Sequence, residues 1–128
     1  MRLEHVAVWT NDLERLRAFY ERYFGAQASP RYRSATRAGF TSYFMTFPEG
    51  RARLEIMHVP SLAATGAAPA IGYAHLAVSL GSEAAVEALT ARLRSEGVRV
   101  VSEPRRTGDG YFEAVIADPD GNLVELVG

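Results

Sequence analysis

The sequence predicts an α+β fold made of two βαβββ modules, and an internal repeat is the first observation that predicts it. The tetrapeptide HVAV at 5–8 returns as HLAV at 75–78, at an offset of 70 residues. The tripeptide LEI at 54–56 returns as VEL at 124–126, at the same offset. Repetition at a fixed spacing indicates two copies of one supersecondary unit.

The order of the elements and a linker are the other two observations. Each copy reads as one strand, one helix and three further strands. Residues 60–70 are rich in Ala, Gly and Pro and have no periodicity, which is typical of a linker. A module of about 60 residues is small for an independent core. We therefore expect one domain over residues 1–128, in which modules 1–60 and 71–128 pack so that their sheets form an open curved cleft.

In the first module, the helix is the clearest element. Apolar residues recur at helical spacing. Asn11 and Asp12 are two candidate N-caps before this segment, and Gly25 follows its last turn. The segment PEG at 48–50 predicts a turn between two strands. The expected elements are a helix at 12–24 and strands at 2–9, 27–34, 40–47 and 52–59.

The second module repeats this order with a less amphipathic helix. Val86, Leu89 and Leu93 lie at helical spacing, Ser82 is the candidate N-cap, and Gly97 follows the last turn. The expected elements are a helix at 82–96 and strands at 72–80, 98–106, 110–117 and 122–127.

The composition excludes several classes of protein. The 128 residues include 14 Arg, no Lys and 15 acidic residues, so the net charge is −1 and nucleic acid is not an expected partner. No apolar run has the ~18–20 residues of a membrane span, and the N-terminus lacks the layout of a signal peptide. With no cysteine, the chain has neither a disulfide nor a thiolate metal site. We expect a cytoplasmic protein that acts on a small molecule and not on a membrane.

Strand alternation sends four reactive side chains to equivalent places. Successive side chains of a strand point to opposite faces, so His5 and Glu55 point away from their apolar neighbours. The same parity separates His75 and Glu125 from their neighbours. Because the apolar neighbours should meet the helix, each module presents one His and one Glu on the sheet face away from its helix.

Two such faces brought together would gather two imidazoles and two carboxylates. A lone strand His is more often a hydrogen-bonded core residue, and a lone strand Glu an exposed carboxylate, but two pairs at one offset favour ligands. Nitrogen and oxygen donors of this kind suit a divalent ion such as Ni, Co, Zn, Mn or Fe. Carboxylates buried together without a cation would be very costly. We therefore expect His5, Glu55, His75 and Glu125 to bind one divalent metal ion.

These residues and the motifs around them resemble the vicinal oxygen chelate superfamily, and within it the glyoxalase I-like lyases. The similarity runs through RLEHVAVWTNDLERLRAFYERYFG, RLEIM and GYAHLAV to the closing DPDGNLVEL. The resemblance implies the same four metal ligands, paired βαβββ modules, a homodimer, and a metal that chelates two neighbouring substrate oxygens. It implies Ni or Co, as in bacterial glyoxalase I relatives, or Zn, as in others.

The presence of Glu55 separates the branches of this superfamily. Ring-cleaving Fe(II) extradiol dioxygenases lack a carboxylate at this place, methylmalonyl-CoA epimerases carry Gln, and bleomycin-binding members have lost the ligands. Glu55 therefore favours a lyase or isomerase that transfers a proton on a metal-chelated α-hydroxycarbonyl substrate. The resemblance to glyoxalase I implies Glu125 as the principal base and Glu55 as the second catalytic carboxylate. A non-catalytic protein that binds a hydrophobic or antibiotic ligand, and an Fe(II) extradiol dioxygenase, stay as alternatives.

The first strand argues against glutathione as part of the substrate. Glutathione-dependent relatives carry Arg where Trp9 stands, and Trp cannot replace a guanidinium that pairs with a carboxylate. We expect a more apolar substrate pocket, with Trp9, Met57, Phe44 and Tyr111 as candidate residues. Core packing is the alternative for Phe44.

Two further groups are weaker candidates. Arg31, Arg33 and Arg37 are interpreted as solvated strand and loop residues, with binding of a substrate anion as the alternative. His58 has the opposite strand parity from Glu55, which predicts a packing or surface role and not a fifth metal ligand.

Overall fold

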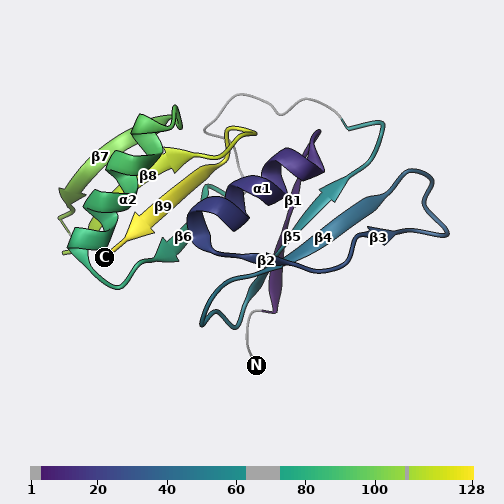
Figure 1. Cartoon of the computed structure of the whole chain (residues 1–128), viewed down its shortest axis with the longest axis horizontal. Coiled ribbons are helices and arrows are strands. Elements are labelled where there is room, and N and C mark those ends of the chain that lie inside the picture. The colour runs from purple at the N-terminus through teal and green to yellow at the C-terminus, as the bar shows by residue number, and fades with distance from the viewer. Residues whose placement is uncertain (1–3, 63–72, 109) are drawn as a thin grey trace. The chain divides into compact units, whose positions relative to one another are not determined.

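One helix and one mixed sheet recur in each half of the chain (Figure 1). This computed structural model describes residues 4–62, 73–108 and 110–128. The chain divides into a first unit, Met1–Thr65, and a second unit, Gly66–Gly128. The predicted linker at 60–70 lies mostly outside the described residues, so its boundaries stay a prediction.

The first unit is a five-stranded sheet with one helix. The sheet order is β1-β5-β4-β2, and β3 also pairs with β4. The first strand, β1, runs parallel to the last strand, β5, whereas β4 runs antiparallel to each of its partners. The elements are β1 (His5–Trp9), α1 (Leu13–Phe24), β2 (Gln27–Ala28), β3 (Tyr32–Arg33), β4 (Thr41–Thr46) and β5 (Arg53–His58).

The second unit repeats this topology with four strands. Its sheet order is β6-β9-β8-β7, with the first and last strands, β6 and β9, again parallel neighbours. The other pairings are antiparallel. The elements are β6 (His75–Ser79), α2 (Glu83–Ser95), β7 (Val100–Arg106), β8 (Phe112–Ala117) and β9 (Leu123–Val127). The second unit has the βαβββ order that the repeat predicted, and the first has the same order with one strand divided in two, which confirms the α+β fold class.

The helices begin and end within one residue of the predicted bounds, 12–24 and 82–96. Of the two candidate N-caps of α1, Asp12 is the cap, and its side chain accepts a hydrogen bond from a backbone N–H of the first turn. Ser82 caps α2 in the same way. Gly25 ends α1 at φ 62°, a left-handed conformation that glycine adopts without strain.

The cores confirm the predicted alternation along the strands. In β5, Leu54 and Ile56 are buried, whereas Glu55 between them is only half-buried. In each unit the helix packs on the apolar face of its own sheet. Full burial of one Leu or Ile side chain contributes about 1.5–3 kcal/mol, so these faces stabilise each unit. The largest fully buried apolar side chains are Leu16, Tyr20, Met45 and Ile56 in the first unit and Val86, Leu93, Ile116, Val124 and Leu126 in the second.

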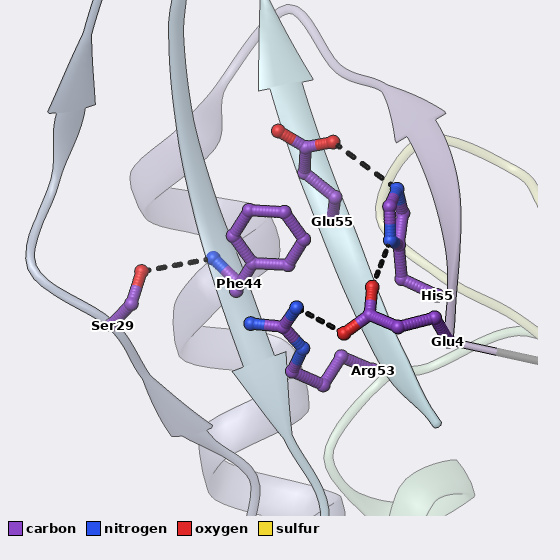
Figure 2. A network of polar contacts seen from close by, with 6 residues as sticks. All are labelled: Glu4, His5, Ser29, Phe44, Arg53 and Glu55. Carbon is purple, nitrogen blue, oxygen red and sulfur yellow. Dashed lines mark hydrogen bonds and ion pairs between the residues drawn. The ribbon is translucent and has the colours of Figure 1, made fainter. Parts of the chain in front are cut away.

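The predicted strand at 27–34 is wrong, because the segment forms two short strands, β2 and β3. The prediction of eight strands therefore becomes nine within the described residues. Pro30 lies between the two strands and has no N–H to donate to the sheet. The backbone N–H of Phe44 instead donates to Ser29 Oγ at 3.0 Å, a side-chain contact that replaces a regular sheet hydrogen bond (Figure 2).

Candidate functional site

The first His–Glu pair lies on the sheet face of the first unit that points away from α1. Ala7 of β1 is the register partner of Glu55 on β5, and His5 precedes Ala7 by two residues on the same face. The Nε2 atom of His5 lies 3.9 Å from Oε2 of Glu55 (Figure 2). The His5 side chain is 39% exposed and that of Glu55 is 15% exposed, so the imidazole is open to ligands while the carboxylate lies deeper.

The second His–Glu pair has the same place in the second unit. Ala77 of β6 is the register partner of Glu125 on β9, and His75 precedes Ala77 by two residues. Nε2 of His75 lies 3.3 Å from Oε2 of Glu125, and the two side chains are 41% and 20% exposed. The second pair therefore has the same register as the first, as the sequence repeat predicted, and its side chains have a similar exposure.

Each pair offers one imidazole nitrogen and one carboxylate oxygen that point toward each other. Divalent ions such as Zn, Ni and Co accept this donor chemistry, so the residues fit a metal ion. The described residues hold no group of three or more His, Cys, Asp or Glu that could bind a metal ion. Because the four expected ligands divide equally between the two units, a common metal centre stays a prediction.

In each unit we call the sheet face that carries the His–Glu pair the ligand face. A pocket of about 600 Å³ lies on the ligand face of the second unit. Its volume is in the range of small-molecule sites. The metal-ligand candidates His75 and Glu125 both line it, and the predicted substrate-binding residue Tyr111 lies in its wall. The remaining lining residues are Ala77, Ser79, Thr107, Glu113 and Val127.

Glu113 is a pocket residue that the sequence reasoning missed. It pairs in register with Val127 of β9, two residues beyond Glu125, so both carboxylates lie on one sheet face. An Oε1 atom of Glu113 accepts an ion-paired hydrogen bond from Arg105 at 3.1 Å, and its side chain is only 15% exposed. The alternation of FEAVIA at 112–117 contains this signal, because Ala114 and Ile116 face the core.

The turn between β7 and β8 places Tyr111 beside the pocket. The backbone N–H of Thr107 donates to the carbonyl of Tyr111 at 2.8 Å, and the Thr107 hydroxyl donates to the same oxygen at 3.1 Å. Tyr111 is 58% exposed, so its ring is open to solvent while its carbonyl accepts both hydrogen bonds.

The DPDGN motif fixes the start of the strand that carries Glu125. Asp118 is 5% exposed and accepts hydrogen bonds from the backbone N–H groups of Asp120 and Asn122 and from Nδ2 of Asn122, at 2.9–3.0 Å. Burial raises the pKa of the Asp118 carboxyl above its ordinary value, although these hydrogen bonds act in the opposite direction. The motif is thus a tight turn that sets the beginning of β9.

In the first unit, the predicted substrate residues Trp9 and Met57 lie on the same face as the first His–Glu pair. They are register partners across β1 and β5. Trp9 is 40% exposed and meets Phe40 edge-on at 6.2 Å. The guanidinium carbon of Arg37 lies 5.3 Å from the Trp9 ring and 5.5 Å from the Phe40 ring. Arg37 is exposed, as the sequence predicted. Its guanidinium also stacks on the two aromatic rings beside the ligand face.

Phe44, the fourth predicted substrate residue, packs against a metal-ligand candidate. It is the register partner of Glu55, and its ring meets the imidazole of His5 edge-on at 5.3 Å (Figure 2). On its other side, the guanidinium carbon of Arg53 lies 4.2 Å from the ring centroid. Phe44 therefore packs on its neighbours on the face that carries His5 and Glu55, and its role in substrate binding stays a prediction.

Glu4 is a second residue that the sequence reasoning missed. Its carboxylate accepts hydrogen bonds from Nδ1 of His5 and from the guanidinium of Arg53 (Figure 2). The hydrogen bond from His5 and then that from Arg53 lower the pKa of the Glu4 carboxyl below its ordinary value. The face argument did not find Glu4, because its backbone position has the opposite parity from that of His5.

His58 has the packing role that its parity predicted. Its ring lies on the other face of β5 from Glu55, and Nδ1 donates to the carbonyl of Thr10 at 2.9 Å. This contact joins the ends of β1 and β5 and takes no part in the ligand face.

Comparison with known proteins places the chain in a family. The sequence profile of the Glyoxalase/Bleomycin resistance protein/Dioxygenase superfamily matches residues 2–126, and the chain belongs to this superfamily. No curated protein sequence matches the chain.

Solved structures show the same fold at low sequence identity. A glyoxylase/bleomycin resistance protein/dioxygenase domain from Frankia sp. EAN1pec is 16% identical, with a TM-score of 0.84 over 99% of this chain and 96% of that chain. The trypanothione-dependent glyoxalase I of Leishmania major is 23% identical, with a TM-score of 0.77 over 100% and 86%. Glyoxalase I from Zea mays is 22% identical, with a TM-score of 0.74 over 98% of this chain but only 44% of the maize chain. This chain therefore spans less than half of the maize enzyme.

Neither helix in the described part of the chain has the length and apolar character to cross a membrane.

Proposed function

We propose that the protein is a metal-dependent lyase or isomerase of the glyoxalase type, which transfers a proton on a metal-chelated α-hydroxycarbonyl substrate. The observation that carries this proposal is the His–Glu pair, which recurs in one register in both units. A module that only sequesters a ligand has no need of four such donors. Membership of the superfamily and the fold shared with glyoxalase I structures support the proposal.

In the proposed site, His5, Glu55, His75 and Glu125 hold one divalent ion, with Ni, Co or Zn favoured and Mn or Fe as further candidates. The ion would supply Lewis-acid stabilisation of the negative charge that develops on two neighbouring substrate oxygens. The cytoplasmic location and the homodimer are parts of the same proposal, and they rest on the family resemblance and on the cysteine-free sequence.

Glu125 is the residue that we propose as the principal base. It lines the pocket of the second unit, so a substrate bound in this pocket can place a carbon atom within reach of its carboxylate. Its side chain is only 20% exposed, so most of it is shielded from solvent. The hydroxyls of Ser79, Thr107 and Tyr111 line the same pocket and offer hydrogen bonds that orient the substrate. In this proposal Glu125 would leave the ion as substrate enters and take the proton from one carbon, and Glu55, in its protonated form, would deliver a proton to the neighbouring carbon. Proton exchange with solvent would then restore both carboxyl groups.

Metal content tests the ligand set. Elemental analysis of protein purified without chelators should find about one divalent ion per chain, and His5→Ala or His75→Ala should lose it. His58→Ala is the matched control, because His58 binds a backbone carbonyl on the opposite face. Equal metal content in all four proteins would contradict the ligand assignment.

Activity tests the reaction class. Metal-loaded protein should be assayed with hemithioacetals, CoA thioesters and catechols. Isomerisation that disappears in Glu125→Gln supports the proposal. Oxygen uptake with catechols would identify an Fe(II) dioxygenase, and tight binding of apolar ligands without turnover would identify a ligand-binding protein.

A further inference from the structure

The two His–Glu pairs agree in register but differ in what surrounds the histidine. In the first unit, Glu4 precedes His5, and Arg53 is the register partner of His5 across β1 and β5. In the second unit the corresponding places hold Ala74 and Leu123. Neither of these apolar side chains can accept or donate a hydrogen bond, so only the first histidine has charged neighbours in its own unit at these places.

Four contacts connect Glu4, His5, Arg53 and Phe44 into one network. The two carboxylate oxygens of Glu4 have separate partners, Nδ1 of His5 for Oε2 and the guanidinium of Arg53 for Oε1 (Figure 2). Arg53 in turn stacks on Phe44 at 4.2 Å, and the same ring packs edge-on against His5. The guanidinium and the imidazole therefore pack against one aromatic ring, and the Glu4 carboxylate joins the two by hydrogen bonds.

The network determines which nitrogen of His5 is free. A neutral imidazole carries one N–H, and an ionised carboxylate can only accept, so the proton lies on Nδ1 where Glu4 accepts it. Nε2 is then a lone-pair donor, and it is this atom that points toward Glu55. At 3.9 Å the Glu55 oxygen is too far away to compete with Glu4 for the proton.

His75 lacks this arrangement. Within the part of the chain that the structure describes, no hydrogen bond reaches Nδ1 of His75 from a protein group. Its Nε2 lies 3.3 Å from Oε2 of Glu125, so a carboxylate faces the atom expected to bind metal, but none among the described residues accepts a proton from Nδ1.

We propose that Glu4 is a positioning residue, held by Arg53, that fixes the proton of His5 on Nδ1 and so leaves Nε2 as a preformed metal donor. The inference rests on the proposed metal-dependent function and adds a role to a residue outside the ligand set. Carboxylates that accept the second N–H of a metal-binding histidine change metal affinity by about 10–100-fold when they are replaced. The competing interpretation is an ordinary surface ion pair between Glu4 and Arg53, which would leave the imidazole unaffected.

The experiment reads the tautomer and the metal affinity separately. Glu4→Ala removes the acceptor, Glu4→Gln keeps an amide oxygen that can accept the same proton, and Glu87→Ala is the control on the exposed face of α2. Nitrogen-15 NMR of the metal-free proteins, at about pH 8.5 where an ordinary histidine is neutral, reports which ring nitrogen of His5 is protonated. Competition with a chromophoric chelator for Zn²⁺ or Co²⁺ reports the affinity.

We expect the wild-type protein, Glu4→Gln and Glu87→Ala to keep the His5 proton on Nδ1. Glu4→Ala should show mixed tautomers and bind the metal about 10–100-fold more weakly. An unchanged tautomer in Glu4→Ala would overturn the proposal whatever the metal affinity, and so would mixed tautomers with unchanged affinity. Wild-type protein that binds no metal would instead overturn the proposed function, and the tautomer measurement would still show whether Glu4 orients the ring.

Discussion

Glu125→Gln is the substitution that most directly tests the proposed proton transfer. Gln has nearly the same volume as Glu and can stay in the space beside Nε2 of His75, but it cannot act as a base at neutral pH. Its neighbours Val124 and Leu126 are fully buried, so the core should hold the backbone of β9 in place. Loss of a general base lowers the rate by 10²–10⁴-fold, which corresponds to about 2.7–5.5 kcal/mol in the activation barrier.

The assay is kcat on the best substrate from the activity screen, with metal occupancy measured in the same sample. Glu87→Gln on the exposed face of α2 should keep wild-type kcat. Glu113→Gln, a second carboxylate of the pocket paired with Arg105, should change KM more than kcat. If Glu125→Gln with full metal occupancy turned over at the wild-type rate, Glu125 would not be the base.

Three other predictions concern the turn, the core and the ligand face. Asp118→Ala removes an acceptor of three hydrogen bonds and should lower the free energy of unfolding by about 2–4 kcal/mol. Urea titrations measure this change, and a change below the error of the fit would contradict the role of the turn. The hydroxyl of Tyr43 donates to Glu14 at 2.7 Å, and this hydrogen bond raises the pKa of Tyr43 above 10.0. The stability that it contributes is present below pH 10.0 and is lost as the pH rises through the higher folded-state pKa, so wild-type protein should lose more stability than Tyr43→Phe in alkaline urea titrations. Trp9 is the single tryptophan and is 40% exposed on the ligand face, so substrate binding should change its fluorescence. A constant emission at saturating substrate would show that the substrate binds elsewhere.

The sequence was sufficient for the faces and the register of the candidate ligands. Strand side chains alternate with a period of two, so a buried neighbour such as Leu54 or Ile56 determines where Glu55 points. The 70-residue offset then transferred the same argument to Glu125. Both inferences depend only on local periodicity, and the structure confirms the faces that they predicted.

Other features depend on side-chain contacts that periodicity does not describe. Glu4 contacts His5 although strand alternation places the two residues on opposite faces. The contact of Glu113 with Arg105 follows register irregularities between β7 and β8. The division of the predicted strand at 27–34 required the Ser29 side chain to satisfy a backbone N–H. The common metal centre needs contributions from both units, and no local pattern in one module determines it.

The parallel pairing of the first and last strands has a consequence for how each unit folds. Fifty residues separate His5 from Glu55, and fifty separate His75 from Glu125. Such long-range neighbours meet only after the entropy of closing the intervening loop has been overcome, so neither pair exists in a partly folded unit. Any ligand that bridges a pair therefore binds only the completed unit, and at a concentration of 100 times its Kd it would add about 2.7 kcal/mol to the stability of that unit. Binding of the ion and completion of the fold are in this way one coupled equilibrium.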